Sequence, residues 1–85
     1  MAIPMRQVIT TPGQIGEILR ARRKARRVPQ LELATKLGIS QSRLSALEGD
    51  AAGLTLDRLL LLAKLLGLEL VVQDRTVSRG DRAEW

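Results

Sequence analysis

Residues 30–49 read QLELATKLGISQSRLSALEG, and the spacing of the apolar residues in this stretch decides the fold. Leu33 and Leu37 lie four positions apart, with Ala34 beside Leu33, which predicts a short amphipathic helix. Gly38 is the expected end of this helix, because glycine tolerates the left-handed backbone conformation of a helix stop. The first of the two helices is therefore predicted to end at Gly38.

A second helix is predicted almost immediately after this stop. Ser40 is a favourable N-cap, and Leu44 and Leu47 fall on one face of the residues that follow it. The connection is so short that the two helices must cross steeply, and Ile39 is expected to fill the angle between them. The stretch therefore predicts a helix-turn-helix.

The other face of the second helix carries small and amide side chains instead of the Lys/Glu mixture of an ordinary solvated surface. Gln can bond adenine at two points in the major groove, and Ser can serve several bases. We therefore predict that Gln41, Ser42 and Ser45 read DNA bases. Ser40 and Arg43 are expected at the DNA backbone. A glycine turn between two amphipathic helices also occurs as a purely structural feature, so the pattern alone leaves both interpretations open.

The stretch resembles the Cro/cI-like helix-turn-helix family, also called the Xre family. The residues that stand at the family's spacing are Gln30, Leu33-Ala34, Gly38-Ile39-Ser40-Gln41, Leu44-Ser45 and Glu48-Gly49. The resemblance implies a mainly α-helical DNA-binding domain of four to five helices, in which Gln30 bonds a DNA phosphate. The chain departs from the family at Arg27, Val28 and Pro29, where many members have a glycine stop and a hydroxyl cap.

Glu48 is predicted to need a cation. It lies four residues after Leu44 and so turns partly toward the core, where a lone carboxylate is unfavourable. In the resembled family an Arg late in the first helix pairs with this Glu, and counting back from Gln30 puts that role on Arg23. The resemblance thus implies a structural Arg23–Glu48 ion pair, not a catalytic dyad.

Composition narrows the function classes. The chain has 85 residues, which is one domain's worth, and a formal charge of +5 with a pI near 11.1. This excess of positive charge predicts a polyanionic partner. The sequence contains no Cys and no His, which excludes disulfides, zinc fingers and His-dependent catalysis. We expect no metal and no cofactor.

An enzyme is the weakest hypothesis. The acidic residues lie scattered on predicted helix surfaces and ends, without a Gly-rich phosphate loop to complete a site. The start of the sequence does not resemble a signal peptide, and no apolar run approaches the roughly 20 residues of a membrane span. We therefore expect a cytoplasmic protein without a membrane partner.

The first helix is predicted over residues 12–27. Thr11 and Gln14 stand at the spacing of a capping box, with Pro12 at the first helical position. The C-terminal half carries a basic run of Arg20, Arg22, Arg23, Lys24, Arg26 and Arg27. This run is either a solvated helix end that suits the helix dipole or, in part, a surface that faces phosphates. Different residues can serve the two roles.

A further helix is predicted over Leu56–Leu66, with Thr55 as its cap and Gly67 as its end. It holds more leucine than one face accommodates. The predicted core face is Leu56, Leu59, Leu60, Ala63 and Leu66. Leu61 and Leu65 are expected on the opposite face, where they imply a partner surface.

Residues 68–73 read LELVVQ, and this alternating, β-branched pattern predicts a short strand. One strand is not stable alone, and the sequence offers no second candidate. We therefore expect Leu68, Leu70, Val71 and Val72 to pair with the same strand of a second subunit across a two-fold axis. The protein is then a homodimer.

The predicted domain covers residues 11–73, between a flexible start at residues 1–10 and a disordered polar tail at residues 74–85. The tail ends in Glu84 and Trp85, and Trp85 is the only aromatic residue of the chain. This whole arrangement resembles the HipB antitoxins, which pair with HipA-type Ser/Thr kinase toxins. The terminal Trp is either neutral or the part of the chain that enters a pocket of the toxin.

This second resemblance implies an antitoxin of a type II toxin-antitoxin module. Such a protein binds a palindromic operator, represses its own operon and holds a HipA-like kinase inactive, with Trp85 in the toxin contact. It is bacterial and associated with the nucleoid. The alternative is a stand-alone phage-type Xre-family repressor without a toxin partner.

Overall fold

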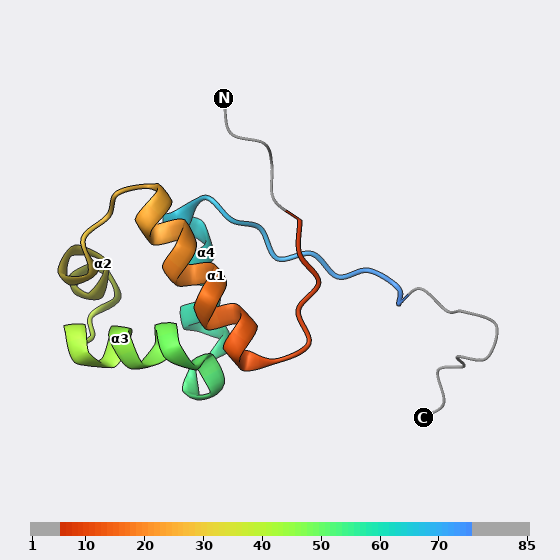
Figure 1. Ribbon diagram of the computed structural model, residues 1–85, viewed down its shortest axis with the longest axis horizontal. Helices are drawn as coiled ribbons and strands as arrows, with labels where there is room; N and C mark the ends of the chain where they lie inside the picture. The colour runs from red at the N-terminus through yellow and green to blue at the C-terminus, as the bar shows by residue number, and fades with distance from the viewer. Residues whose placement is uncertain (1–5, 76–85) are drawn as a thin grey trace.

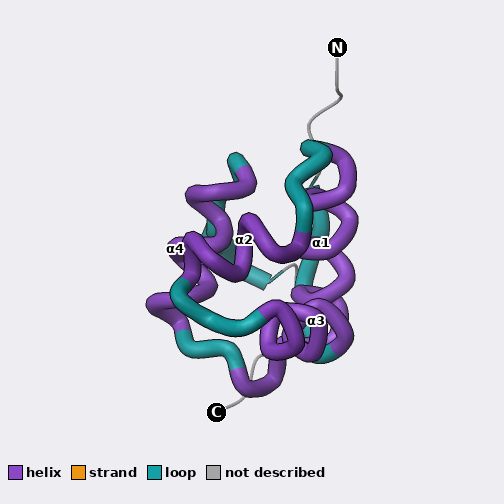
Figure 2. Tube along the Cα trace, turned by 90° about the vertical axis from the view of Figure 1, so that its left-hand side faces the viewer, coloured by secondary structure: helices purple, strands orange, loops and turns teal. Residues whose placement is uncertain are grey.

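The computed structural model describes residues 6–75, which form a small, mainly helical domain (Figure 1). The helices are α1 (Pro12–Ala25), α2 (Gln30–Leu37), α3 (Gln41–Gly49) and α4 (Leu56–Leu66), and a 3-10 turn, η1 (Ala51–Gly53), connects α3 to α4. In Figure 1, α1 lies in front of α4. In the view of Figure 2, α4 is on the left and α1 on the right, with α2 between them and α3 below. None of these four helices is long and apolar enough to cross a membrane.

The helix starts follow the predicted caps. Thr11 Oγ1 accepts a hydrogen bond from the Gln14 backbone N–H at 3.3 Å, and Gln14 Oε1 accepts one from the Thr11 N–H at 2.9 Å, which closes the capping box. Ser40 and Thr55 cap α3 and α4 through their hydroxyl oxygens. α2 starts after Pro29 without a side-chain cap, as expected from the missing hydroxyl residue. Each confirmed cap satisfies a backbone N–H that the helix itself leaves unpaired.

Two helices end as predicted, and one, α1, ends earlier than predicted. Gly38 and Gly67 end α2 and α4 in the left-handed conformation, with φ of 71° and 72°, as predicted. α1 ends at Ala25, before the predicted Arg27, and Arg27 itself has a φ of 56°. For a residue with a Cβ, this left-handed conformation costs roughly 1–2 kcal/mol of conformational free energy. Arg27 therefore takes the backbone shape that a glycine would adopt more easily.

The core consists of leucine and alanine side chains from all four helices. The buried cluster is Leu19, Leu33, Ala34, Leu37, Leu44, Leu62 and Leu66, with Ile15, Val28, Ile39, Leu54, Leu65 and Leu68 packed against it. Burying one leucine side chain contributes about 1.5–3 kcal/mol. The helix-turn-helix leucines thus belong to the same core as α1 and α4, and α3 packs on this core through its buried face.

The buried face of α4 differs from the predicted one. Leu62 is fully buried, whereas Leu56 and Leu60, predicted in the core, are 66% and 49% exposed. Leu65 packs against the core instead of facing away from it. The prediction is confirmed for Ala63 and Leu66, which are buried, and wrong for Leu56 and Leu60. Leucines fill α4 almost continuously, so periodicity does not identify one face, and the packing of α1 and α2 selects Leu62.

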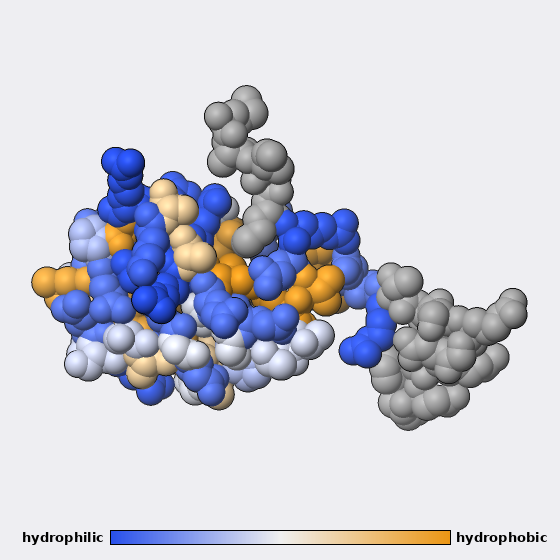
Figure 3. Space-filling model, in the orientation of Figure 1, coloured by the Kyte–Doolittle hydropathy of each residue, from blue (hydrophilic) through white to orange (hydrophobic). Residues whose placement is uncertain are grey.

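The predicted strand at residues 68–73 is absent from the described part of the chain. The Leu68 N–H bonds the Ala63 oxygen at 2.7 Å, and the following residues run on as a loop. A strand needs a hydrogen-bonded neighbour, and within residues 6–75 the single chain supplies none. Val71 and Val72 are 74% and 100% exposed. Figure 3 shows hydrophobic side chains gathered on this face of the domain.

The N-terminal segment lies beside this C-terminal segment. Arg6 Nη2 donates a hydrogen bond to Gln73 Oε1, and Figure 1 shows the two segments crossing. Val8 and Ile9 are exposed there too. The described chain ends therefore meet on one side of the helices, away from α3.

α1 and α3 approach each other closely at Gly16. A methyl group built on Gly16 would lie 2.8 Å from the backbone oxygens of Leu47 and Glu48. Both atoms are backbone, so neither moves aside cheaply. The crossing of α1 over the end of α3 therefore requires a residue without a side chain.

We expect Gly16→Ala to lower the free energy of unfolding by about 1–3 kcal/mol through overpacking, although alanine favours a helix by about 1 kcal/mol. Gly13→Ala is the matched control in the same helix, because the nearest atom to a Cβ there is 3.9 Å away. Its stability should be unchanged or slightly raised. Urea unfolding followed by circular dichroism measures both variants, and equal stabilities would contradict the close approach.

Candidate nucleic-acid interface

A buried ion pair joins α1 to α3. Arg23 Nε donates to Glu48 Oε2 at 2.6 Å and Arg23 Nη2 donates to Glu48 Oε1 at 3.1 Å, so the guanidinium holds the carboxylate at two points. Arg23 Nη1 donates to the Val28 oxygen at 3.0 Å. The two side chains are only 10% and 3% exposed. Hydrogen bonding to Glu48 raises the pKa of Arg23, while burial opposes this rise, so the Arg23 guanidinium keeps its positive charge.

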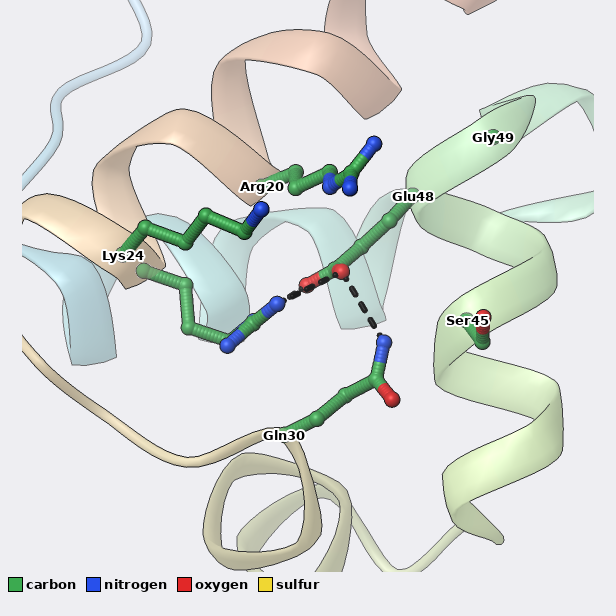
Figure 4. Close-up of a pocket in the computed structure, with 7 residues that line it drawn as sticks. Arg20, Lys24, Gln30, Ser45, Glu48 and Gly49 are labelled. Carbon is green, nitrogen blue, oxygen red and sulfur yellow. Dashed lines mark hydrogen bonds and ion pairs between the residues drawn. The ribbon is translucent and has the colours of Figure 1, made fainter.

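Gln30 links this ion pair to the start of α3. Its Nε2 donates to Glu48 Oε1 at 3.1 Å, and its Oε1 accepts a hydrogen bond from Gln41 Nε2 at 3.2 Å. Figure 4 shows the Gln30 amide and the Glu48 carboxylate facing each other. One chain of hydrogen bonds therefore connects Arg23, Glu48, Gln30 and Gln41. An amide nitrogen carries two hydrogens, so Gln30 retains an N–H for an outside acceptor such as a phosphate.

The predicted base-reading residues lie together on the outer side of α3. Gln41, Ser42 and Ser45 are exposed, while Leu44 and Leu47 on the other side are buried. Within residues 6–75, neither Ser42 nor Ser45 uses its hydroxyl in a hydrogen bond. The face is thus small, polar and open to an external partner.

Ser40 and Arg43, which were predicted to contact the DNA backbone, each form one hydrogen bond within the domain. Ser40 Oγ accepts the Arg43 N–H at 3.0 Å, which leaves its own O–H able to donate. Arg43 Nη2 lies 3.4 Å from the Gly53 oxygen, so its side chain turns toward the loop before α4. This contact is long and exposed, and it occupies only one of the five guanidinium hydrogens.

The remaining predicted site residues do not join this face. Leu68 packs on the core, and Leu70, Val71 and Val72 are exposed on the C-terminal segment. Trp85 lies outside the described residues, as do residues 1–5 and 76–85 of the predicted flexible ends. No group of acidic side chains within residues 6–75 is arranged to hold a metal ion.

A pocket of about 360 Å³ opens between α1 and α3 beside the ion pair (Figure 4). Its lining residues are Arg20, Arg23, Lys24, Gln30, Ser45, Glu48 and Gly49. From the sequence, Arg20 and Lys24 were predicted only as members of the basic run. Their four-residue spacing, which puts them on one helix face, was the signal that could have singled them out.

Two comparisons with known proteins bear on this site. A family described as helix-turn-helix matches residues 19–73, which include the C-terminal half of α1 and all of α2, α3 and α4. The chain is also 32% identical over 73 residues to an immunity repressor protein of Bacillus phage phi105, an alignment that covers 84% of the chain and 51% of the relative. The chain therefore spans about half the length of this relative.

We expect Glu48→Ala to lower the free energy of unfolding by about 3–5 kcal/mol, because it leaves the buried Arg23 without its counter-charge. Glu32→Ala is the control. Glu32 forms an exposed ion pair with Lys36 at 3.6 Å, and such pairs contribute at most about 1 kcal/mol. Urea unfolding compares the two, and equal losses would show that the buried pair has no special role.

Proposed function

The chain belongs to the helix-turn-helix family, and on that premise we propose that it is a sequence-specific DNA-binding repressor that inserts α3 into the major groove. The observation that carries the proposal is the exposed polar face of α3, held from behind by the ion pair of Arg23 and Glu48. The formal charge of +5 supports a polyanionic partner. The phage repressor to which the chain is similar supports the repressor role.

The side chains divide into two roles. Gln41 reads a base, with Ser42 and Ser45 beside it on the same face, because amide and hydroxyl groups match the base edges in the major groove. Gln30, Ser40 and Arg43 hold the DNA backbone and carry no sequence information themselves. The bond between Gln41 and Gln30 supports this division, since it joins a reading side chain to a positioning one.

The repressor acts as a homodimer. Residues 11–73 form the DNA-binding and dimerisation unit, and residues 68–73 pair with the same segment of a second subunit. The exposed Leu70, Val71 and Val72 support this arrangement, because a second subunit would remove their apolar surface from water. A two-fold dimer binds a palindromic operator with half-sites about one DNA turn, roughly 34 Å, apart.

A stand-alone repressor is the preferred form of this proposal over an antitoxin. The similar phage protein is named an immunity repressor, which matches the repressor role more directly than an antitoxin role. The antitoxin alternative depends on the C-terminal sequence, whose Trp85 lies outside the described residues. Co-purification of a kinase-like protein with the chain from its native host would favour the antitoxin.

We expect Gln41→Ala to weaken binding to the operator by about 1–3 kcal/mol and to leave binding to unrelated DNA nearly unchanged, because the lost contact reads a base. The operator is obtained as the duplex that the wild-type chain selects from a random pool. Titration of both duplexes with wild-type and variant protein makes the comparison. Equal losses on the two duplexes would remove Gln41 from the base-reading set.

We expect Val71→Pro to weaken the dimer, because proline removes a backbone N–H from the intersubunit pairing. Val71→Thr is the matched control, since threonine keeps both the N–H and the branched Cβ. Sedimentation equilibrium over a range of protein concentrations measures the dissociation constant of each variant. A dimer as strong as the wild type after Val71→Pro would move the interface to the exposed leucines of α4.

A further inference from the structure

The structure divides the basic run of α1 between different partners. Arg22 Nε and Arg26 Nη1 donate to the Leu66 oxygen at 3.0 and 3.1 Å, so these two side chains satisfy the C-terminal end of α4. Arg23 is buried in the pair with Glu48. These three arginines therefore have structural roles, and the remaining cations of the helix need a separate explanation.

Arg20 and Lys24 lie one turn apart on the side of α1 that faces the pocket (Figure 4). Both side chains are exposed, and within residues 6–75 neither has a carboxylate within ion-pair distance. The only carboxylate that lines the pocket is that of Glu48, and Arg23 already neutralises it. The pocket thus has an uncompensated positive charge.

We propose that Arg20 and Lys24 form a phosphate-binding site that holds one DNA strand in the pocket between α1 and α3. This inference rests on the proposed function and extends it to residues outside the helix-turn-helix itself. Arg20 offers a planar guanidinium that can bond two phosphate oxygens, and Lys24 offers a point charge. Such contacts fix the position of the protein on DNA without reading its sequence.

The chemistry of the pocket favours a phosphate over an organic ligand. No apolar or aromatic side chain lines it, whereas pockets for small organic molecules are mostly apolar. Its walls instead combine cations with the neutral polar groups of Gln30 and Ser45. An anion is therefore the complementary ligand.

The position of the pocket selects DNA as the source of that phosphate. Ser45 lines the pocket and also belongs to the base-reading face of α3, so a strand read by α3 passes the pocket. Gly49 lines the same wall, and a Cβ built there would meet no atom within 4 Å. The wall next to Arg20 and Lys24 is thus open to the close approach of a sugar-phosphate backbone.

The test compares two lysine variants with the same change in net charge. Lys24→Gln removes a pocket cation, and Lys64→Gln removes an exposed cation in the last turn of α4 that does not line the pocket. Each protein is titrated with the selected duplex and with an unrelated duplex over a range of salt concentrations. Urea unfolding checks that both variants are folded.

We expect Lys24→Gln to weaken binding to both duplexes by the same factor, roughly eightfold for each lost contact at about 0.1 M salt, and to reduce the salt slope by about 0.9 for each contact. Lys64→Gln should bind as the wild type does. Arg20→Gln should behave like Lys24→Gln, and Lys24→Arg should keep the wild-type slope.

Two results would overturn the site. Equal affinities and slopes for Lys24→Gln and Lys64→Gln would show that the pocket does not meet DNA, and a loss confined to the selected duplex would mean that Lys24 reads a base. Both results presuppose that the wild-type protein prefers the selected duplex. A wild-type chain that prefers no duplex would instead contradict the proposed function, so the two failures are distinguishable.

Discussion

The buried ion pair of Arg23 and Glu48 is the interaction on which the interface depends, because it fixes α1 against the end of α3. A carboxylate at this crossing has lost its water and requires a full counter-charge with good geometry. Gly16 serves the same crossing by letting α1 approach the backbone of Leu47 and Glu48. Charge pairing and close approach thus act at one place, and together they set how α3 projects from the domain.

The same pair prepares the outer face of α3 for binding. Glu48 accepts a hydrogen bond from Gln30, and Gln30 accepts one from Gln41, so a side chain on the exposed face of α3 is linked to the buried ion pair. Within the described residues, no buried polar side-chain atom lacks a partner. A side chain that is already oriented loses less conformational freedom on binding. The hydrogen bonds therefore let a small domain present a defined surface.

Local signals made the helix-turn-helix predictable, whereas long-range packing decided the rest. Ser40 and Gly38 act within one turn of the chain, so their caps follow from the sequence alone. The buried face of α4 was predicted only in part, because the burial of Leu62 depends on which helices cover α4. The separate roles of Arg22 and Lys24 also depend on packing. Arg22 reaches the end of α4, whereas Lys24 lines the pocket next to α3. A strand at residues 68–73 requires a neighbour that one chain does not contain.

The proposed repressor function requires that the hydrogen-bond chain from the buried ion pair orients Gln41, the proposed base-reading side chain of α3. The most direct measurement is a double-mutant cycle of Gln30→Ala and Gln41→Ala, scored by the free energy of binding to the selected duplex. If Gln30 positions Gln41, the two losses are coupled by at least about 0.5 kcal/mol, as for residues in one hydrogen-bond network. Losses that add within about 0.3 kcal/mol would contradict the account, because the two side chains would then act independently on DNA.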